Sequence, residues 1–119
     1  MEVIDLVEFI RKLKIPYSTE KEMQESLFSC FSSAGFNVQR EFSLSPKDRI
    51  DFLITLESGA VGVECKTKGT PISIYRQLER YSKYDCISSL VLITSKHMNA
   101  GDEIKGKPTY TVKTGTKWL

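Results

Sequence analysis

Hydrophobic residues in the first third of the chain recur at helical spacing. Residues 3–14 form a moderately amphipathic pattern, with apolar residues on more than one side, and Pro16 ends it. A second helix is predicted from Ser18 or Thr19, either of which can cap it, to Gly35. Its spacing predicts a buried stripe of Met23, Leu27, Phe31 and Ala34.

After Gly35 the period changes to alternation, which predicts strands. The predicted elements are strands over residues 36–42, 49–57 and 61–66, a helix over 71–84, and strands over 88–95 and 106–114. The first of these strands has a possible slip near its end, and the last is predicted to lie at the outer edge. A helix between the third and fourth strands implies a crossover and at least one parallel pair. We therefore predict an α/β fold with a central mixed sheet of four to five strands flanked by helices, in the order α-α-β-β-β-α-β-β.

The composition is that of one soluble globular domain. The chain has 119 residues, of which 40% are hydrophobic and 27% charged. No internal repeat or linker divides it, so we expect a single domain over residues 1–119. No apolar run is long enough to span a bilayer, and the charged N-terminal segment resembles neither a signal peptide nor an anchor. We therefore expect a cytoplasmic protein without a membrane partner.

The cysteines, the single histidine and the single tryptophan give little indication of function. The three cysteines, Cys30, Cys65 and Cys86, are widely spaced, which favours reduced thiols in the core over a disulfide framework or a zinc site. His97 has no partner at a telling spacing and is interpreted as structural or incidental, and Trp118 as an apolar plug. The net charge is only +2, so any surface for nucleic acid must come from local clustering of basic residues.

Two neighbouring strands carry the residues that suggest chemistry. Asp51 interrupts an apolar strand, opposite a face made of Ile50, Phe52 and Ile54, and Glu64 and Lys66 share one face of the next strand. Charged groups in such places are costly unless they are paired, ligated or exposed. They are either the solvated face of an ordinary strand or half of a metal site.

If the two strands are adjacent, Asp51 and Glu64 converge. Two carboxylates, the backbone carbonyl of Cys65 and several waters suit Mg²⁺, and Mn²⁺ is expected to substitute. Lys66 would then lie close enough to orient or deprotonate a water. A site of this kind hydrolyses phosphodiesters.

Asp51, twelve intervening residues and Glu64-Cys65-Lys66 resemble the signature of the PD-(D/E)XK nuclease superfamily. This superfamily includes restriction endonucleases, archaeal Holliday-junction resolvases and RecB-like exonucleases. The resemblance covers residues 18–112, and the predicted order of elements matches the restriction-endonuclease-like core. The motif's proline is absent, because Arg49 and Ile50 precede Asp51. Asp48 is a rival acid, but it lies in the predicted turn.

Two further segments match the superfamily. Glu20 in "TEKEMQ" resembles the acid near the start of the helix before the first strand, and it shares a helix side with Gln24. Gln77-x-x-x-Tyr81 resembles the QxxxY element of RecB-like nucleases. The resemblance implies a catalytic set of Glu20, Asp51, Glu64, Lys66 and Gln77, with the metal on Asp51, Glu64 and the Cys65 carbonyl.

The same resemblance implies a nucleic-acid substrate, with DNA favoured. A basic stripe on the helix over 71–84 suits phosphates, although it is equally a solvated face paired with Glu79, and Tyr81 is equally a packing residue. The predicted nucleic-acid-binding residues are Lys68, Arg76, Arg80, Tyr81 and Lys83, with Lys47 as a possible extension.

The predicted function is thus a Mg²⁺-dependent nuclease, in the first place an endonuclease, of the kind found in phages and mobile elements. Residues 1–16 are a candidate interface for a homodimer, and a larger protein partner is the other possible source of specificity. The alternative prediction is a nuclease fold kept as a catalytically silent binding or regulatory module.

Overall fold

A computed structural model of the chain describes residues 1–16 and 18–114. The order of the predicted elements is confirmed, and one two-residue strand is added before the last. Trp118 lies outside the described residues. The elements are α1 (Val3–Arg11), α2 (Glu20–Ser33), β1 (Asn37–Ser43), β2 (Arg49–Leu56), β3 (Gly59–Lys66), α3 (Pro71–Ser82), β4 (Ser89–Thr94), β5 (Glu103–Ile104) and β6 (Lys107–Lys113).

The strands form one mixed six-stranded sheet in the order β1-β2-β3-β4-β6-β5, so the predicted count of four to five strands is wrong because the short strand β5 joins the edge. The first three strands are antiparallel neighbours, whereas β3 with β4 and β4 with β6 are parallel. The predicted parallel pair across α3 is therefore confirmed, and so is the α/β class. The prediction that β6 is the outer strand is wrong, because β5 pairs with its free edge.

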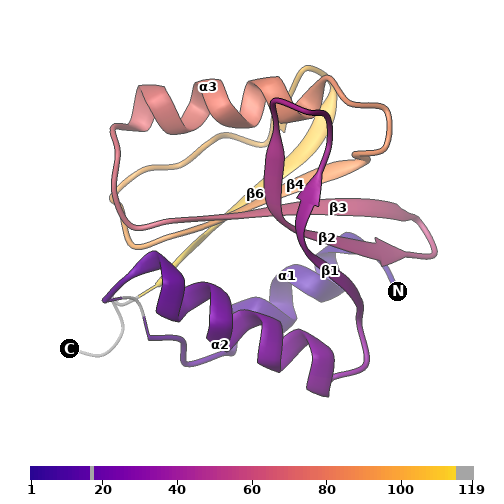
Figure 1. Cartoon of the computed structure of the whole chain (residues 1–119), viewed down its shortest axis with the longest axis vertical. Helices are drawn as coiled ribbons and strands as arrows, with labels where there is room; N and C mark the ends of the chain where they lie inside the picture. Colours follow the sequence, from indigo (N-terminus) through magenta and orange to yellow (C-terminus); the bar gives the residue numbers. More distant parts are fainter. Residues whose placement is uncertain (17, 115–119) are drawn as a thin grey trace.

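Helices cover both faces of the sheet, α1 and α2 on one face and α3 on the other (Figure 1). Each face has its own hydrophobic core. One core joins α1 and α2 to residues such as Phe52 and Val63, and the other joins α3 to residues such as Leu53 and Leu90. β4 lies between the two cores and is buried along its whole length, as its continuous apolar run predicts.

The helix ends follow the predicted capping chemistry. The Thr19 hydroxyl accepts a hydrogen bond from the backbone N–H of Glu22, which caps α2, and Gly35 follows the helix with φ +87°. The buried stripe predicted for α2 is confirmed at Met23, Leu27 and Phe31. It is wrong at Ala34, which is exposed because α2 ends at Ser33 and the chain turns away from the core there.

The face predicted for Ile50 is wrong. Phe52 and Ile54 pack against α1 and α2, but Ile50 packs in the core beneath α3. The alternation of β2 is therefore broken at the intervening residue, Asp51. Gly62 on the neighbouring strand makes room for Ile50, because a Cβ atom at Gly62 would lie only 2.6 Å from the Ile50 Cδ1 atom.

α1 is part of the core, through Leu6, Val7 and Ile10. Its apolar residues do lie on more than one side, since Ile4 is 48% exposed. Within residues 1–16 and 18–114, no helix is both long and apolar enough to cross a membrane.

The cysteines differ in their surroundings. Cys65 is buried in the core beside α1 and α2, and Cys30 is half-buried. The prediction that Cys86 is a core residue is wrong, because it lies exposed in the turn that precedes β4. His97 lies in the loop after β4, where its Nδ1 atom is 3.2 Å from the Lys113 Nζ atom.

Candidate active site

Three neighbouring strands lose their regular pairing at one row of the sheet. The β2–β3 ladder ends at the pair Phe52 and Val63. The β1–β2 ladder skips Glu41 and Asp51 and resumes beyond them in the same register, so the slip predicted in β1 is an interruption rather than a shift. Glu41 has φ +51°, a left-handed conformation that few residues other than glycine adopt. The strands are thus opened at the row that contains Asp51.

Carboxylates replace the missing backbone hydrogen bonds at this row. The backbone N–H of Cys65 donates to the Asp51 Oδ2 atom at 2.8 Å. The backbone N–H of Asp51 donates to the Glu64 Oε1 atom at 3.2 Å. Buried backbone donors need a partner, and here the two acids supply it across the gap between β2 and β3. Asp51 and Glu64 therefore converge, as the sequence predicts.

The two acids are held in an environment that disfavours their negative charges. Glu64 is only 3% exposed, and burial, followed by the charge of Asp51, raises the pKa of Glu64 to about 8. Burial also raises the pKa of Asp51, while the hydrogen bond from Cys65 and the charge of Lys66 oppose the rise. Because the two carboxylates destabilise each other when both are ionised, a cation placed between them would be stabilising.

Lys66 lies beside this pair at the end of β3. Its Nζ atom is 3.6 Å from the Glu64 Oε2 atom, and its side chain is 21% exposed. The Thr94 hydroxyl donates a hydrogen bond of 2.7 Å to the Lys66 carbonyl and so ties the end of β3 to β4. Lys66 thus combines a fixed backbone with a side chain that reaches both the buried acid and solvent.

α2 supplies two polar residues to the same region. The Glu20 Oε1 atom accepts a hydrogen bond of 2.9 Å from the backbone N–H of Thr67, which joins the start of α2 to the end of β3. Gln24, one turn later, hydrogen-bonds to Asp51 and lowers its pKa. Sequence reasoning placed Gln24 on the side of α2 that carries Glu20 but gave it no role.

Gln77 and Tyr81 meet on one face of α3, as their spacing predicts. The Gln77 Nε2 atom donates to the Tyr81 hydroxyl at 2.7 Å, and that hydroxyl donates to the Arg49 carbonyl at 3.0 Å. Tyr81 is 2% exposed, so its predicted contact with nucleic acid does not agree with its buried position. It anchors α3 to the start of β2.

The acids open into a polar pocket of about 440 Å³ between α2, the first three strands and α3. A second pocket of about 460 Å³ lies on the other side of Lys66 and includes Glu20 and Lys68. Lys66 lines both. The polar residues that line the first pocket are Lys21, Gln24, Arg40, Glu41, Arg49, Asp51, Glu64, Lys66 and Gln77.

The predicted basic stripe on α3 does not line either polar pocket. The Arg80 Nε atom pairs at 3.3 Å with Asp48, the acid in the turn before β2, rather than with Glu79. Arg76 and Lys83 are exposed on α3. The cations that do surround the acids are Lys21, Arg40 and Arg49, which sequence reasoning did not assign. Arg40 could have been noticed in the sequence, because it places a charged residue where the alternation of Phe36 and Val38 predicts an apolar one.

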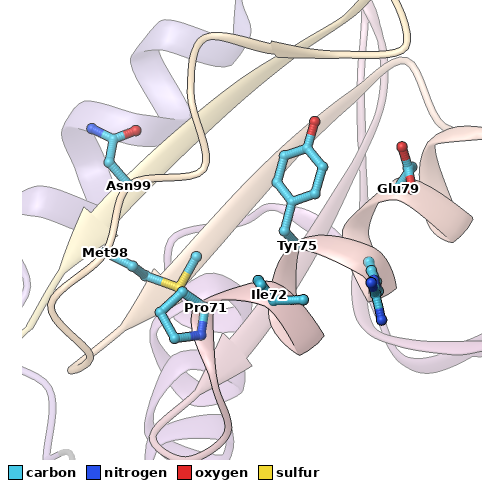
Figure 2. Close-up of a pocket in the computed structure, with 7 residues that line it drawn as sticks. Pro71, Ile72, Tyr75, Glu79, Met98 and Asn99 are labelled. Atoms are coloured by element: carbon cyan, nitrogen blue, oxygen red, sulfur yellow. The ribbon is translucent and has the colours of Figure 1, made fainter.

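A third pocket, of about 470 Å³, lies beside the start of α3 and is of a different kind (Figure 2). Pro71, Ile72, Tyr75 and Met98 give it a mostly apolar lining, and Tyr75 rises from α3 beside the segment that carries Met98. Glu79 is the one carboxylate among its lining residues. This pocket lacks the converging acids, so the polar pocket at Asp51 is the candidate active site.

The donor set at the opened row fits a hard divalent cation. Carboxylate and carbonyl oxygens are the ligands that Mg²⁺ and Mn²⁺ prefer. In a strand, the N–H and C=O of one residue face the same neighbour, so the Cys65 carbonyl faces the gap that holds Asp51. In the described parts of the chain, no group of three or more His, Cys, Asp or Glu side chains is arranged to hold a metal. An ion would therefore depend on Asp51, Glu64, the Cys65 carbonyl and waters.

No protein-family model matches this chain, and no curated protein sequence gives a significant match.

Proposed function

We propose that the protein is a divalent-metal-dependent nuclease of the PD-(D/E)XK type that hydrolyses phosphodiester bonds, with DNA as the favoured substrate. One observation carries the proposal. Asp51 and Glu64 replace the backbone ladder between β2 and β3, and the Lys66 Nζ atom lies 3.6 Å from Glu64. The hydrogen bonding of an ordinary sheet gives no reason to bury two acids at this row.

Each residue of the site has a distinct role in this proposal. Asp51, Glu64 and the Cys65 carbonyl would hold Mg²⁺ or Mn²⁺. When bound, such an ion stabilises negative charge on the phosphate and lowers the pKa of a water. Lys66, which reaches both Glu64 and solvent, would orient the attacking water by donating a hydrogen bond to it. Glu20 and Gln77 support the site from α2 and α3.

The arrangement of the sheet is compatible with the restriction-endonuclease-like core that the resemblance implies. Three antiparallel strands are followed by α3 and by β4, which is parallel to β3. Asp51 lies near the start of β2 and Glu64 near the end of β3, an arrangement that is compatible with the motif. Lys68, in the pocket next to Lys66, is retained as a nucleic-acid contact, and Arg76 and Lys83 as more distant ones. Exposed Met1 and Ile4 keep α1 as the proposed homodimer interface.

The test is a cleavage assay on supercoiled, linear, branched and single-stranded DNA, and on RNA, with Mg²⁺ or Mn²⁺. We expect Lys66→Ala and Asp51→Asn to abolish cleavage and Lys105→Gln, at an exposed lysine between β5 and β6, to leave it unchanged. Cleavage that persists in both site variants would refute the site. Binding of nucleic acid without cleavage of any substrate would support the silent binding module instead.

A further inference from the structure

Arg40 carries an unsatisfied donor next to the acids. Its Nε atom is buried and has no hydrogen-bond partner among the described residues. A buried donor without a partner is costly, and native proteins keep few of them. The Arg40 side chain also lines the polar pocket that contains Asp51 and Glu64. An acceptor that enters this pocket is therefore the natural partner of Arg40.

The guanidinium is held in place before any ligand arrives. Its Cζ atom lies 5.8 Å from the centre of the Phe28 ring, within the range of a cation–π contact. Phe28 in turn stacks on Phe52, with ring centres 6.5 Å apart and planes 7° apart. Phe52 is the cross-strand partner of Arg40. A side chain that is already ordered loses less entropy on binding, so this arrangement favours recognition of a ligand.

The charge around Arg40 also favours an anion. Lys21 and Arg49 line the same pocket, and the Arg49 Nε atom is 3.9 Å from Glu41. Lys66 has Glu64 as its neighbour. In residues 1–16 and 18–114, no carboxylate forms an ion pair with Arg40. Among the described residues, Arg40 and Lys21 are thus the two pocket cations that form no ion pair with a protein acid, and only Arg40 also has a buried donor without a partner.

We infer that Arg40 binds a phosphate group of the substrate, so that the substrate strand enters the site along β1 and α2. The planar guanidinium can donate two parallel hydrogen bonds to phosphate oxygens, a geometry that lysine does not reproduce. The identity of the ligand as a nucleic-acid strand rests on the proposed nuclease function. Arg40 is a binding residue in this inference and has no part in the chemical step.

The experiment measures the binding of a fluorescein-labelled DNA duplex by anisotropy, in EDTA and at several salt concentrations. We expect Arg40→Gln to weaken binding about tenfold and to lower the salt slope by about one, as the loss of one phosphate contact predicts. Arg40→Lys should fall between Arg40→Gln and wild type. Lys105→Gln, whose ammonium pairs with Glu79 and lies between β5 and β6, is the control for loss of one surface charge and should bind like wild type.

The outcomes separate this inference from the proposed function. If both Arg40 variants bind the duplex like Lys105→Gln, with an unchanged salt slope, the inference is overturned, even if Lys66→Ala still abolishes cleavage. If Arg40→Gln does not fold, Arg40→Lys alone decides, and wild-type affinity in that variant overturns the inference. If the wild type cleaves nothing, inorganic phosphate becomes the probe. Thermal stabilisation of the wild type but not of Arg40→Lys then supports the phosphate site without the nuclease.

Discussion

The two ends of the β2–β3 hairpin are built on different principles. Near the turn, five consecutive residue pairs form a regular antiparallel ladder that ends at Phe52 and Val63. Most of the side chains at that end pack into the apolar cores on the two faces of the sheet. At the opposite end the ladder is missing, and Asp51 and Glu64 accept backbone hydrogen bonds instead.

This difference separates what stabilises the fold from what the site requires. The ladder end combines paired backbone with buried apolar surface, both of which favour folding. The open end buries two acids whose charges are disfavoured, and it leaves the Arg40 Nε atom without a hydrogen-bond partner among residues 1–16 and 18–114. Substitutions at the open end should therefore mainly lower activity, and substitutions at the ladder end should mainly lower stability.

The largest expected effect is at the open end. Asp51→Asn should reduce cleavage by about a thousandfold or more, equivalent to about 4 kcal/mol, because a metal-dependent step relies on that carboxylate. The same change removes one of two mutually repelling buried charges, while the amide oxygen can still accept from Cys65. Without metal, at a pH above the raised pKa of Glu64, we expect the free energy of unfolding to stay unchanged or to rise by about 1 kcal/mol. Chemical denaturation of both proteins, measured beside the cleavage assay, checks this; a loss of stability equal to that of a core variant would contradict it.

The ladder end should respond in the reverse way. Phe52→Ala removes a fully buried ring that contacts Phe28 and Phe31, and we expect the free energy of unfolding to fall by about 3–5 kcal/mol. Thr55→Ala, at an exposed position of the same strand, is the control and should change the free energy by less than about 0.5 kcal/mol. Urea denaturation measures both. A drop of less than about 1 kcal/mol for Phe52→Ala would show that this end does not hold the fold as described.

In the unsubstituted protein, the open end should make the stability depend on pH. The pKa of Glu64 is raised from 4.5 in an exposed state to about 8 in the fold, so the folded state keeps a proton that the unfolded state has already lost. The stability gained from this proton is fully present below about pH 4.5 and disappears as the pH rises through about 8. Between about pH 6 and about pH 9 we expect metal-free protein to lose about 2 kcal/mol.

Denaturation curves across this pH range, with and without Mg²⁺, measure the effect. Glu64→Gln should flatten the dependence, and Mg²⁺ should restore stability at high pH, because the ion binds the ionised pair. A stability that rises steadily towards pH 9 without metal would contradict the burial of the acids.

The smallest effect concerns the contact between α3 and the open row. Tyr81→Phe removes a hydroxyl that accepts from Gln77 and donates to the Arg49 carbonyl. We expect the free energy of unfolding to fall by about 1–2 kcal/mol and cleavage to fall only modestly, because Tyr81 supports the site without touching it. Loss of cleavage as complete as in Lys66→Ala, with stability intact, would instead assign Tyr81 a catalytic role.

Local patterns were enough to predict the elements and the meeting of the acids. The change from helical spacing to alternation after Gly35 located the strands, and the helix before β4 predicted the parallel pair. The convergence of Asp51 with Glu64 followed from the adjacency of two hairpin strands. These features depend on short-range periodicity and on short connections between neighbouring elements, and both can be read directly from the sequence.

The features that could not be predicted depend on contacts between distant residues. The change of face at Ile50 follows from the interrupted ladder at Glu41 and Asp51, and alternation alone cannot reveal it. Arg80 lies 32 residues from Asp48, the acid that engages it. The stacking of Arg40 on Phe28 likewise requires α2 and β1 to pack together.

A crystal soaked in Mn²⁺ tests whether the opened row between β2 and β3 is a site for a divalent cation. We expect an anomalous-scattering peak between the carboxylates of Asp51 and Glu64, within bonding distance of the Cys65 carbonyl. A crystal that shows no peak there, while both carboxylates keep their hydrogen bonds to the backbone, would contradict this expectation.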